Sequence, residues 1–247
     1  MAPLLAVRSP HGKFGGTFTG AVVVDDGIVV ASDSRSTFVD DSGKFFGYVD
    51  GMPKIFVDRS TAFAVSGLTS VDDELFSSFV ARNSYLMTRS VNEILYGLLL
   101  KLPLRNGANV LLISAGFADG QATICTKNLA DPQICKTTGF ITNKPSSSLT
   151  RWMIAAKGVL PGPADAAAAL RDAIQESADL DSAVGGPISV LHLRKSGAPE
   201  WLQNPPQDHG WTKVCDIVSA YRQGKAQIIF TNSKEELDRY LVSVCPK

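Results

Sequence analysis

A hydroxyl, a carboxylate and a guanidinium lie at the ends of two neighbouring hydrophobic segments, where they could support nucleophilic chemistry. Thr17 and Thr19 open the first segment, and Asp33 and Arg35 close the second. A turn at Asp25-Asp26-Gly27 would join the two segments as a β-hairpin. That turn places Thr17 opposite Arg35. It also places Thr19 opposite Asp33, and opposed residues of an antiparallel pair project to the same face. The spacing therefore predicts one cluster at the open end of the hairpin.

This cluster depends on the register of the hairpin. A shift of one residue would send Asp33 to the face of Phe18, because side chains alternate between the two faces of a strand. The simpler alternative is a solvated strand end, in which Asp33 pairs with Arg35 at the surface and Thr17 is only a strand residue. Taken alone, the hairpin favours that alternative.

Two further features make chemistry at this hairpin more plausible. Gly15-Gly16 comes directly before Thr17, and Lys54 opens a second hairpin that ends at Ser66-Gly67. A lysine and a glycine turn add a cation and backbone amides, which are groups that activate a nucleophile and bind an oxyanion. A surface position for Lys54 is the alternative.

Composition excludes several classes of function. The 247 residues carry 24 basic and 24 acidic side chains, and 45% are hydrophobic, which is typical of a soluble globular protein. The neutral balance and the lack of a Lys/Arg run argue against a nucleic-acid partner. Apolar stretches are too short for a membrane helix, so no membrane is expected. No export signal is recognised near the start, which predicts a cytoplasmic protein.

The four cysteines (Cys125, Cys135, Cys215 and Cys245) show no metal-binding spacing. Cys125 and Cys135 could face each other across a hairpin, but in a reducing cytoplasm ordinary core thiols are the expectation. Neither a metal nor another cofactor is predicted.

Residue patterns predict runs of strands and runs of helices rather than strict alternation, which favours an α+β protein with mostly antiparallel sheets. Strands are expected at 17–24, 28–33, 54–58, 61–66, 109–115, 121–126, 133–142 and 188–193. Helices are expected from capping boxes at Ser70/Asp73, Ser90/Glu93 and Ser233/Glu236, and over 148–156 and 163–178. Loops are expected at 34–53 and 197–210. We expect a leader at 1–16 and one domain over 17–247.

Two strings, GTFTGAVVVDDGIVVASDSRST and the later PKIFVDRSTAFAVSGLTSVDDEL, resemble the N-terminal half of a proteasome β-type subunit, and the resemblance implies a bacterial proteasome-like protein. This family belongs to the N-terminal-nucleophile (Ntn) hydrolases. Gly16-Thr17 matches the junction at which the family removes its propeptide. The similarity runs from about residue 15 to 75 and resumes over 164–193.

Other matches concern the residues around that junction. Asp33 and Arg35 match the Asp-Ser-Arg motif of the family, and Lys54 matches its active-site lysine. Ser66-Gly67 matches the turn that supplies an oxyanion-hole amide. Supporting positions, by the same resemblance, are Arg35, Gly67, Asp181 and Ser182.

The resemblance implies a four-layer αββα sandwich, with two antiparallel sheets between helix pairs. It also implies a threonine peptidase that cleaves itself at Gly16-Thr17 and then uses the freed α-amino group as its base. That group has an unperturbed pKa of ~7.7–8.0, so much of it is neutral at pH 7. A nearby Lys54 cation would lower this pKa further, and Asp33 would compensate the lysine charge.

Two departures from the family pattern leave a second function open. Val184 stands where catalytic members usually carry a serine, and the Gly-Ser-Gly motif before the third helix is absent, with Ser146-Ser147-Ser148 in that neighbourhood. The alternative is a catalytically silent structural subunit of a ring. No Gly-x-Ser-x-Gly elbow supports a Ser-His-Asp hydrolase.

The resemblance also implies the partners. These are peptide or unfolded protein substrates, other copies of the chain in a homo-oligomeric ring, and an ATP-dependent unfoldase. Residues 199–247 extend beyond the usual C-terminus of the family.

Overall fold

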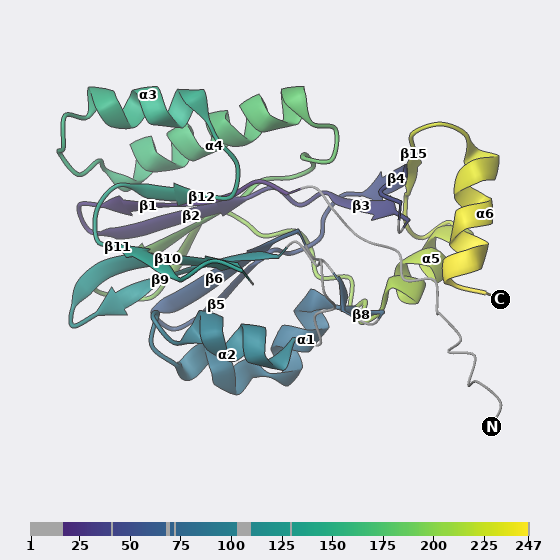
Figure 1. The fold of residues 1–247 in the computed structure, drawn as a ribbon, viewed down its shortest axis with the longest axis horizontal. Helices are drawn as coiled ribbons and strands as arrows, with labels where there is room; N and C mark the ends of the chain where they lie inside the picture. Colours follow the sequence, from purple (N-terminus) through teal and green to yellow (C-terminus); the bar gives the residue numbers. More distant parts are fainter. Residues whose placement is uncertain are drawn as a thin grey trace.

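A computed structural model describes residues 17–40, 42–67, 70–71, 73–102, 110–128 and 130–246. The leader predicted at 1–16, including Gly16, lies outside these residues. Within them, two five-stranded antiparallel sheets are stacked face to face, and helices cover the outer face of each sheet (Figure 1). The chain therefore has the predicted four-layer α+β sandwich.

The first sheet carries the hairpin that the sequence singled out. Its order across the sheet is β12 (Phe140–Thr142), β1 (Thr19–Val24), β2 (Gly27–Ser32), β13 (Ser189–Arg194) and β14 (Glu200–Gln203). Helices α3 (Ser147–Ala155) and α4 (Pro163–Leu180) cover its outer face. Both faces of β1 are buried, because Val22 packs toward these helices and Val23 packs between the sheets. The β1–β2 hairpin is therefore covered on both sides.

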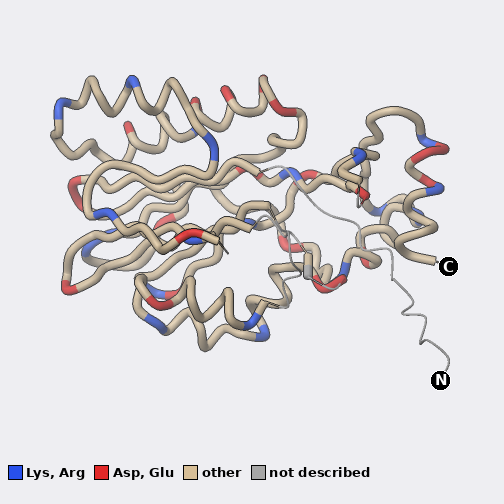
Figure 2. The backbone as a smooth tube through the Cα atoms, viewed as in Figure 1, with Lys and Arg blue, Asp and Glu red and all other residues tan. Residues whose placement is uncertain are grey.

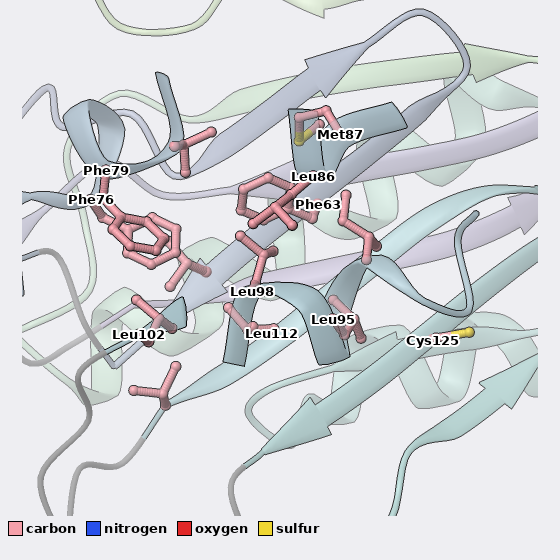
Figure 3. Close-up of a cluster of buried hydrophobic side chains, with 14 of the residues drawn as sticks. Phe63, Phe76, Phe79, Leu86, Met87, Leu95, Leu98, Leu102, Leu112 and Cys125 are labelled. Carbon is pink, nitrogen blue, oxygen red and sulfur yellow. The ribbon is translucent and has the colours of Figure 1, made fainter. Parts of the chain in front are cut away.

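The second sheet lies beneath the first. Its order is β11 (Ile134–Lys136), β10 (Gln121–Asn128), β9 (Leu111–Ala118), β6 (Thr61–Ser66) and β5 (Ile55–Asp58). Its outer face is covered by α1 (Phe76–Arg82), the 3-10 helix η1 (Ser84–Thr88) and α2 (Ile94–Lys101). Figure 3 shows the core between them, where Phe63 and Leu112 of the sheet meet Phe76, Leu95 and Leu98 of the helices.

A third group of elements lies beside the sandwich. It contains the small sheet β15 (Ile229–Phe230), β4 (Phe45–Val49) and β3 (Ser36–Val39), together with α5 (Val214–Arg222) and α6 (Lys234–Val244) (Figure 1). Strands β3 and β4 form a second hairpin, whose Phe38 and Val49 pack with Ile217 of α5 and Leu237 of α6. The last part of the chain is thus built onto the segment that follows Asp33. We call α5, β15 and α6 the C-terminal layer.

The predicted loop at 34–53 is wrong, because this segment forms β3 and β4. The sequence of the β3–β4 hairpin gives no local signal for its order, since its apolar partners lie in the C-terminal layer, from Val214 onward. The predicted loop at 197–210 likewise contains β14.

The capping box predicted at Ser70/Asp73 is also wrong. Ser70–Val71 and Glu74–Leu75 form the two short strands β7 and β8, and Asp73 has a positive φ of 73° at the turn between them. Helix α1 begins only at Phe76, without a side-chain cap. The cap at Ser233 is confirmed, because its hydroxyl accepts the backbone N–H of Glu236 at 3.1 Å.

The single strand predicted at 133–142 is two strands in two different sheets. β11 pairs with β10 in the second sheet, whereas β12 pairs with β1 in the first. Gly139, which lies between β11 and β12, has a φ of 78°. This short stretch therefore ties the two sheets together.

All four cysteines are paired, which corrects the expectation of ordinary core thiols. Cys125 and Cys135 lie directly opposite each other in the β10–β11 ladder and form one disulfide. Cys215 of α5 and Cys245, at the end of α6, form the other. The second disulfide closes the C-terminal layer on itself.

Charged side chains of both signs are spread over the same elements (Figure 2). Helix α6 is an example, with Glu235 and Glu236 in its first turn between Lys234 and Arg239. Across the described ranges, no helix is both long and apolar enough to span a membrane.

Candidate functional site

The centre of the candidate site is a buried ion pair. Lys54 Nζ lies 2.9 Å from Asp33 Oδ1, and neither side chain is exposed to solvent. The same ammonium donates to the Arg35 carbonyl oxygen at 2.5 Å. Asp33 follows β2 and Lys54 precedes β5, so the pair joins the two stacked sheets. The alternative of a surface lysine at position 54 is excluded.

Asp33 gathers backbone amides from distant segments. Its Oδ1 accepts the N–H of Phe18 at 3.0 Å, and its Oδ2 accepts the N–H of Gly185 at 2.9 Å. A third N–H, that of Arg35, donates to Oδ2 at 3.3 Å. Three backbone donors, together with Lys54, fix the orientation of this buried carboxylate. Asp33 therefore fixes the residue next to Thr17.

Burial lowers the pKa of Lys54 below its ordinary value, because desolvation disfavours the ammonium. The charge of Asp33 and its hydrogen bond oppose that effect. Lys144 acts in the same direction as burial, as a second nearby cation. The ammonium of Lys54 is thus held in place by Asp33 in a site without solvent, and a positive charge there would disfavour protonation of another amine nearby.

Thr17 lies two residues before β1 and is only 2% exposed. Its carbonyl oxygen accepts a hydrogen bond of 2.7 Å from Asn143 Nδ2. Its neighbour Phe18 is fully buried in the core beneath α4 and bonds Asp33 through its backbone. The peptide bond between Thr17 and Phe18 is therefore held at its oxygen by Asn143 and at its N–H by Asp33.

The predicted register of the first hairpin is wrong by one residue. Thr19 pairs with Ser32, so the turn contains only Asp25 and Asp26, and Gly27 is the first residue of β2. Glycine is needed there for packing, because a Cβ on Gly27 would come within 2.0 Å of the Leu193 carbonyl oxygen.

In the observed register, Asp33 lies opposite Phe18 and not opposite Thr19. The pair nevertheless lies just beyond the ends of both strands, where alternation no longer dictates the direction of a side chain. The Asp33 carboxylate turns to the Phe18 amide and to Lys54 there, so the site assembles by a route that the hairpin argument did not describe.

Arg35 does not pair with Asp33, as the surface alternative supposed. Its guanidinium forms a two-pronged bond with Asp50, at 2.8 and 3.1 Å, and lies 3.6 Å from the ring centroid of Tyr48. It also donates to the Ser182 carbonyl oxygen at 3.0 Å. Arg35 therefore joins β4 to the loop after α4, and its own carbonyl holds Lys54.

The loop after α4 brings together the remaining predicted residues. Asp181 ends the helix, accepts the Ala183 N–H, and pairs with Lys144 at 2.5 Å. Partial burial opposes ionisation of Asp181, but the hydrogen bonds from Lys144 and the Ala183 N–H, together with the Lys144 charge, outweigh it and lower the pKa of the carboxyl. The Gly185 carbonyl in this loop accepts the Arg35 N–H at 2.9 Å. A side chain at 185 would clash with the Arg35 guanidinium, since a Cβ would lie 2.8 Å from Cζ.

Ser182 and Val184 do not supply a hydroxyl to this arrangement. Ser182 is exposed, and the contact it makes with Arg35 is through its main-chain carbonyl. Val184 is 1% exposed and packs in the apolar core between the first sheet and the helices. Gly67 follows β6 directly, and its backbone is in the left-handed region, with a φ of 82°.

Sequence reasoning missed Asn143 and Asp50. Asn143 follows β12 and bonds Thr17, Thr19 and Ser66. Asp50 follows β4 in the segment predicted to be a loop. Asn143 directly follows the strand predicted at 133–142, a position where functional side chains often lie, and that was the available signal. Asp50 offered no such signal, because the strand before it was not predicted.

One group of potential metal ligands is found among the described residues, namely Asp73, Cys215 and Cys245. Both sulfurs are bonded to each other, so they are not thiolate ligands.

Comparison with solved structures identifies the class of fold. The chain is similar to Anbu (ancestral beta-subunit) from Yersinia bercovieri, with a TM-score of 0.55 and 15% identity, covering 83% of this chain and 96% of that one. The fold is therefore proteasome-like. No known family's sequence profile matches the chain, and no curated protein matches it.

Proposed function

We propose that this protein is a proteasome-like threonine peptidase that exposes Thr17 as its N-terminal nucleophile by cleaving the Gly16–Thr17 bond. The observation that carries the proposal is the fully buried Asp33–Lys54 ion pair, bonded to the backbone amide of the residue after Thr17. A charged pair is costly to bury, so its place beside a potential nucleophile favours a chemical role.

The proposed first step is intramolecular. Thr17 Oγ attacks the Gly16 carbonyl carbon, the peptide C–N bond breaks, and its nitrogen takes up the hydroxyl proton, leaving an ester. Water then hydrolyses the ester and releases residues 1–16 with a free α-amino group on Thr17. Glycine at position 16 suits this step because it has no Cβ to hinder the approach.

The proposed peptidase step uses the new amine as the base. With an ordinary pKa of ~7.7–8.0, lowered by the neighbouring Lys54 cation, it accepts the Thr17 Oγ proton directly or through water. Oγ attacks the substrate carbonyl, and the Gly67 amide donates to the oxyanion, where one such donor is worth roughly 3–4 kcal/mol. The protonated amine returns its proton to the leaving nitrogen, and water completes the turnover.

Intact mass measures the first step directly. Purified wild-type protein should lose residues 1–16, and Thr17→Ala should keep them. Thr17→Ser should restore cleavage, because serine also supplies an Oγ. Activity on a panel of fluorogenic peptides should be present in the wild type and in Thr17→Ser and absent in Thr17→Ala. A wild-type chain that keeps its leader, or a Thr17→Ala chain that loses it at Gly16, would contradict the proposal.

The second candidate is a silent structural subunit, and Val184 is the observation that favours it. Its side chain belongs to the apolar core and provides no polar group at a position where catalytic members of the resembled family carry a serine. An assembled wild-type protein with an intact leader and no peptidase activity would support this candidate.

We also propose that copies of the chain form a ring that encloses the site, with peptides or unfolded proteins as substrates and an ATP-dependent unfoldase as a partner. This part rests on the family resemblance. Mass photometry of the purified protein should give a single high-order species, and a monomer at micromolar concentration would contradict a ring.

A further inference from the structure

The connection between β12 and α3 contacts three separate parts of the candidate site. It begins with Asn143 and Lys144. Asn143 contacts the segment around Thr17 and the end of β6, and Lys144 pairs with Asp181 in the loop after α4. These three regions carry the proposed nucleophile, the proposed oxyanion turn and the loop that holds Asp33.

Asn143 uses its whole side chain and its backbone. Its Oδ1 accepts the Thr19 N–H at 2.7 Å, and its own N–H donates to the Thr19 carbonyl oxygen at 3.1 Å. Because the oxygen of the amide must face the Thr19 N–H, the Nδ2 group faces the other way. It donates to the Thr17 carbonyl oxygen at 2.7 Å and to Ser66 Oγ at 2.5 Å.

The two Nδ2 bonds join groups that belong to different sheets. Thr17 leads into β1 of the first sheet, and Ser66 is the last residue of β6 in the second. Ser66 precedes Gly67, whose amide is the proposed oxyanion donor. One planar amide thus sets the separation between the nucleophile-bearing residue and the turn that would receive the negative charge.

We propose that Asn143 is a positioning residue of the threonine chemistry, which holds the Thr17 carbonyl and the Ser66-Gly67 turn in register through Nδ2. This inference rests on the proposed function. A misplacement of reacting groups by about 1 Å can cost on the order of a hundredfold in rate, so loss of this link should act on turnover more than on substrate binding.

Two variants separate positioning from simple strand anchoring. Asn143→Asp keeps an oxygen acceptor for the Thr19 N–H and removes the Nδ2 donor, whereas Asn143→Ala removes both. If Nδ2 is what matters, both variants should slow leader loss and lower kcat by about tenfold to a hundredfold, with KM changed less than threefold. If only the anchor to Thr19 matters, Asn143→Asp should behave like wild type.

Asn83→Asp is the matched control. Asn83 lies at the end of α1, and its Nδ2 also donates to a backbone carbonyl oxygen, that of Phe79, at 2.8 Å. The control loses the same kind of bond in the helix layer of the second sheet, and should leave kcat and the rate of leader loss unchanged. Thermal unfolding of all variants shows whether each is folded at the assay temperature.

Leader loss on the full-length chain distinguishes the possible failures. A wild type that never loses residues 1–16 overturns the proposed function, and the role of Asn143 with it. A wild type that matures, with Asn143→Asp maturing and turning over at the same rate, overturns the positioning role alone. A fall in kcat equal to that of Asn83→Asp would also overturn it.

Discussion

At the scale of single residues, the Asp33–Lys54 pair concentrates charge where the protein excludes water. The pair is satisfied from several directions, by backbone amides on the aspartate and by the Arg35 carbonyl on the lysine. Removing one partner would leave the other buried and unpaired, which is the costly case for a buried ion pair.

We expect Asp33→Asn and Lys54→Met each to lower the free energy of unfolding by roughly 3–5 kcal/mol. The double variant should lose clearly less than the sum of the two, because neither charge is left alone. Urea unfolding at pH 7 measures all three. Glu200→Gln is the control, since it breaks an exposed pair with Arg194 and should cost less than about 1 kcal/mol. Additive losses in the double variant would contradict a coupled pair.

At the scale of elements, the structure shows which parts of the fold a local pattern can predict. Strand β6 at Thr61–Ser66 has the predicted bounds, and α6 begins at its predicted cap, because both signals lie within a few neighbouring residues. The β3–β4 hairpin was missed because its order depends on packing against α5 and α6.

The candidate site divides in the same way. Asp33 and Lys54 were found from a family motif and do lie together, yet the register that was used to argue for the cluster was off by one. Gly27 was taken for a turn residue, whereas it is a strand residue that Leu193 approaches closely. Asn143 was missed because its partners come from both sheets, and no local pattern reports that contact.

The start of α3 gives a prediction about pH. The Glu176 carboxylate of α4 accepts the hydroxyls of Ser147, Ser148 and Ser146 and the Ser148 N–H, which lowers the pKa of Glu176. A carboxyl with a lowered pKa in the folded state stabilises the fold above its unfolded pKa and loses that contribution as the pH falls below it.

We therefore expect Glu176→Gln to lower the melting temperature at pH 7, and the gap from wild type to narrow as the pH falls below about 4. Differential scanning fluorimetry across pH 3–7 would measure it. Asp172→Asn, on the exposed face of the same helix, should show only a small difference throughout. A gap for Glu176→Gln that stays constant with pH would argue against the capping role.

At the scale of the whole molecule, all four cysteines are engaged in two disulfides. One joins β10 to β11 in the sandwich, and the other closes the C-terminal layer. Such pairing is typical of proteins that fold under oxidising conditions. The sequence, by contrast, predicts a cytoplasmic location, where thiols are kept reduced.

Thiol labelling distinguishes a protein with both disulfides formed from one with reduced cysteines. Protein purified without reductant and unfolded in the presence of iodoacetamide should take up no label, and after reduction it should take up label at all four cysteines. Loss of the Cys215–Cys245 disulfide, which spans 30 residues, should lower the free energy of unfolding by about 3–4 kcal/mol. Full labelling of native protein taken directly from cytoplasm would show that the chain works with reduced thiols.

The bond from Gly185 to Asp33 joins residues 152 positions apart, and it has a consequence for synthesis. A ribosome would have made the proposed nucleophile, its lysine and its oxyanion turn long before it reached the amide that completes the aspartate's shell. A nascent chain therefore carries all the reactive groups in an unfinished setting. On the proposed function, self-cleavage therefore has to wait until residue 185 has been synthesised and its amide has reached Asp33.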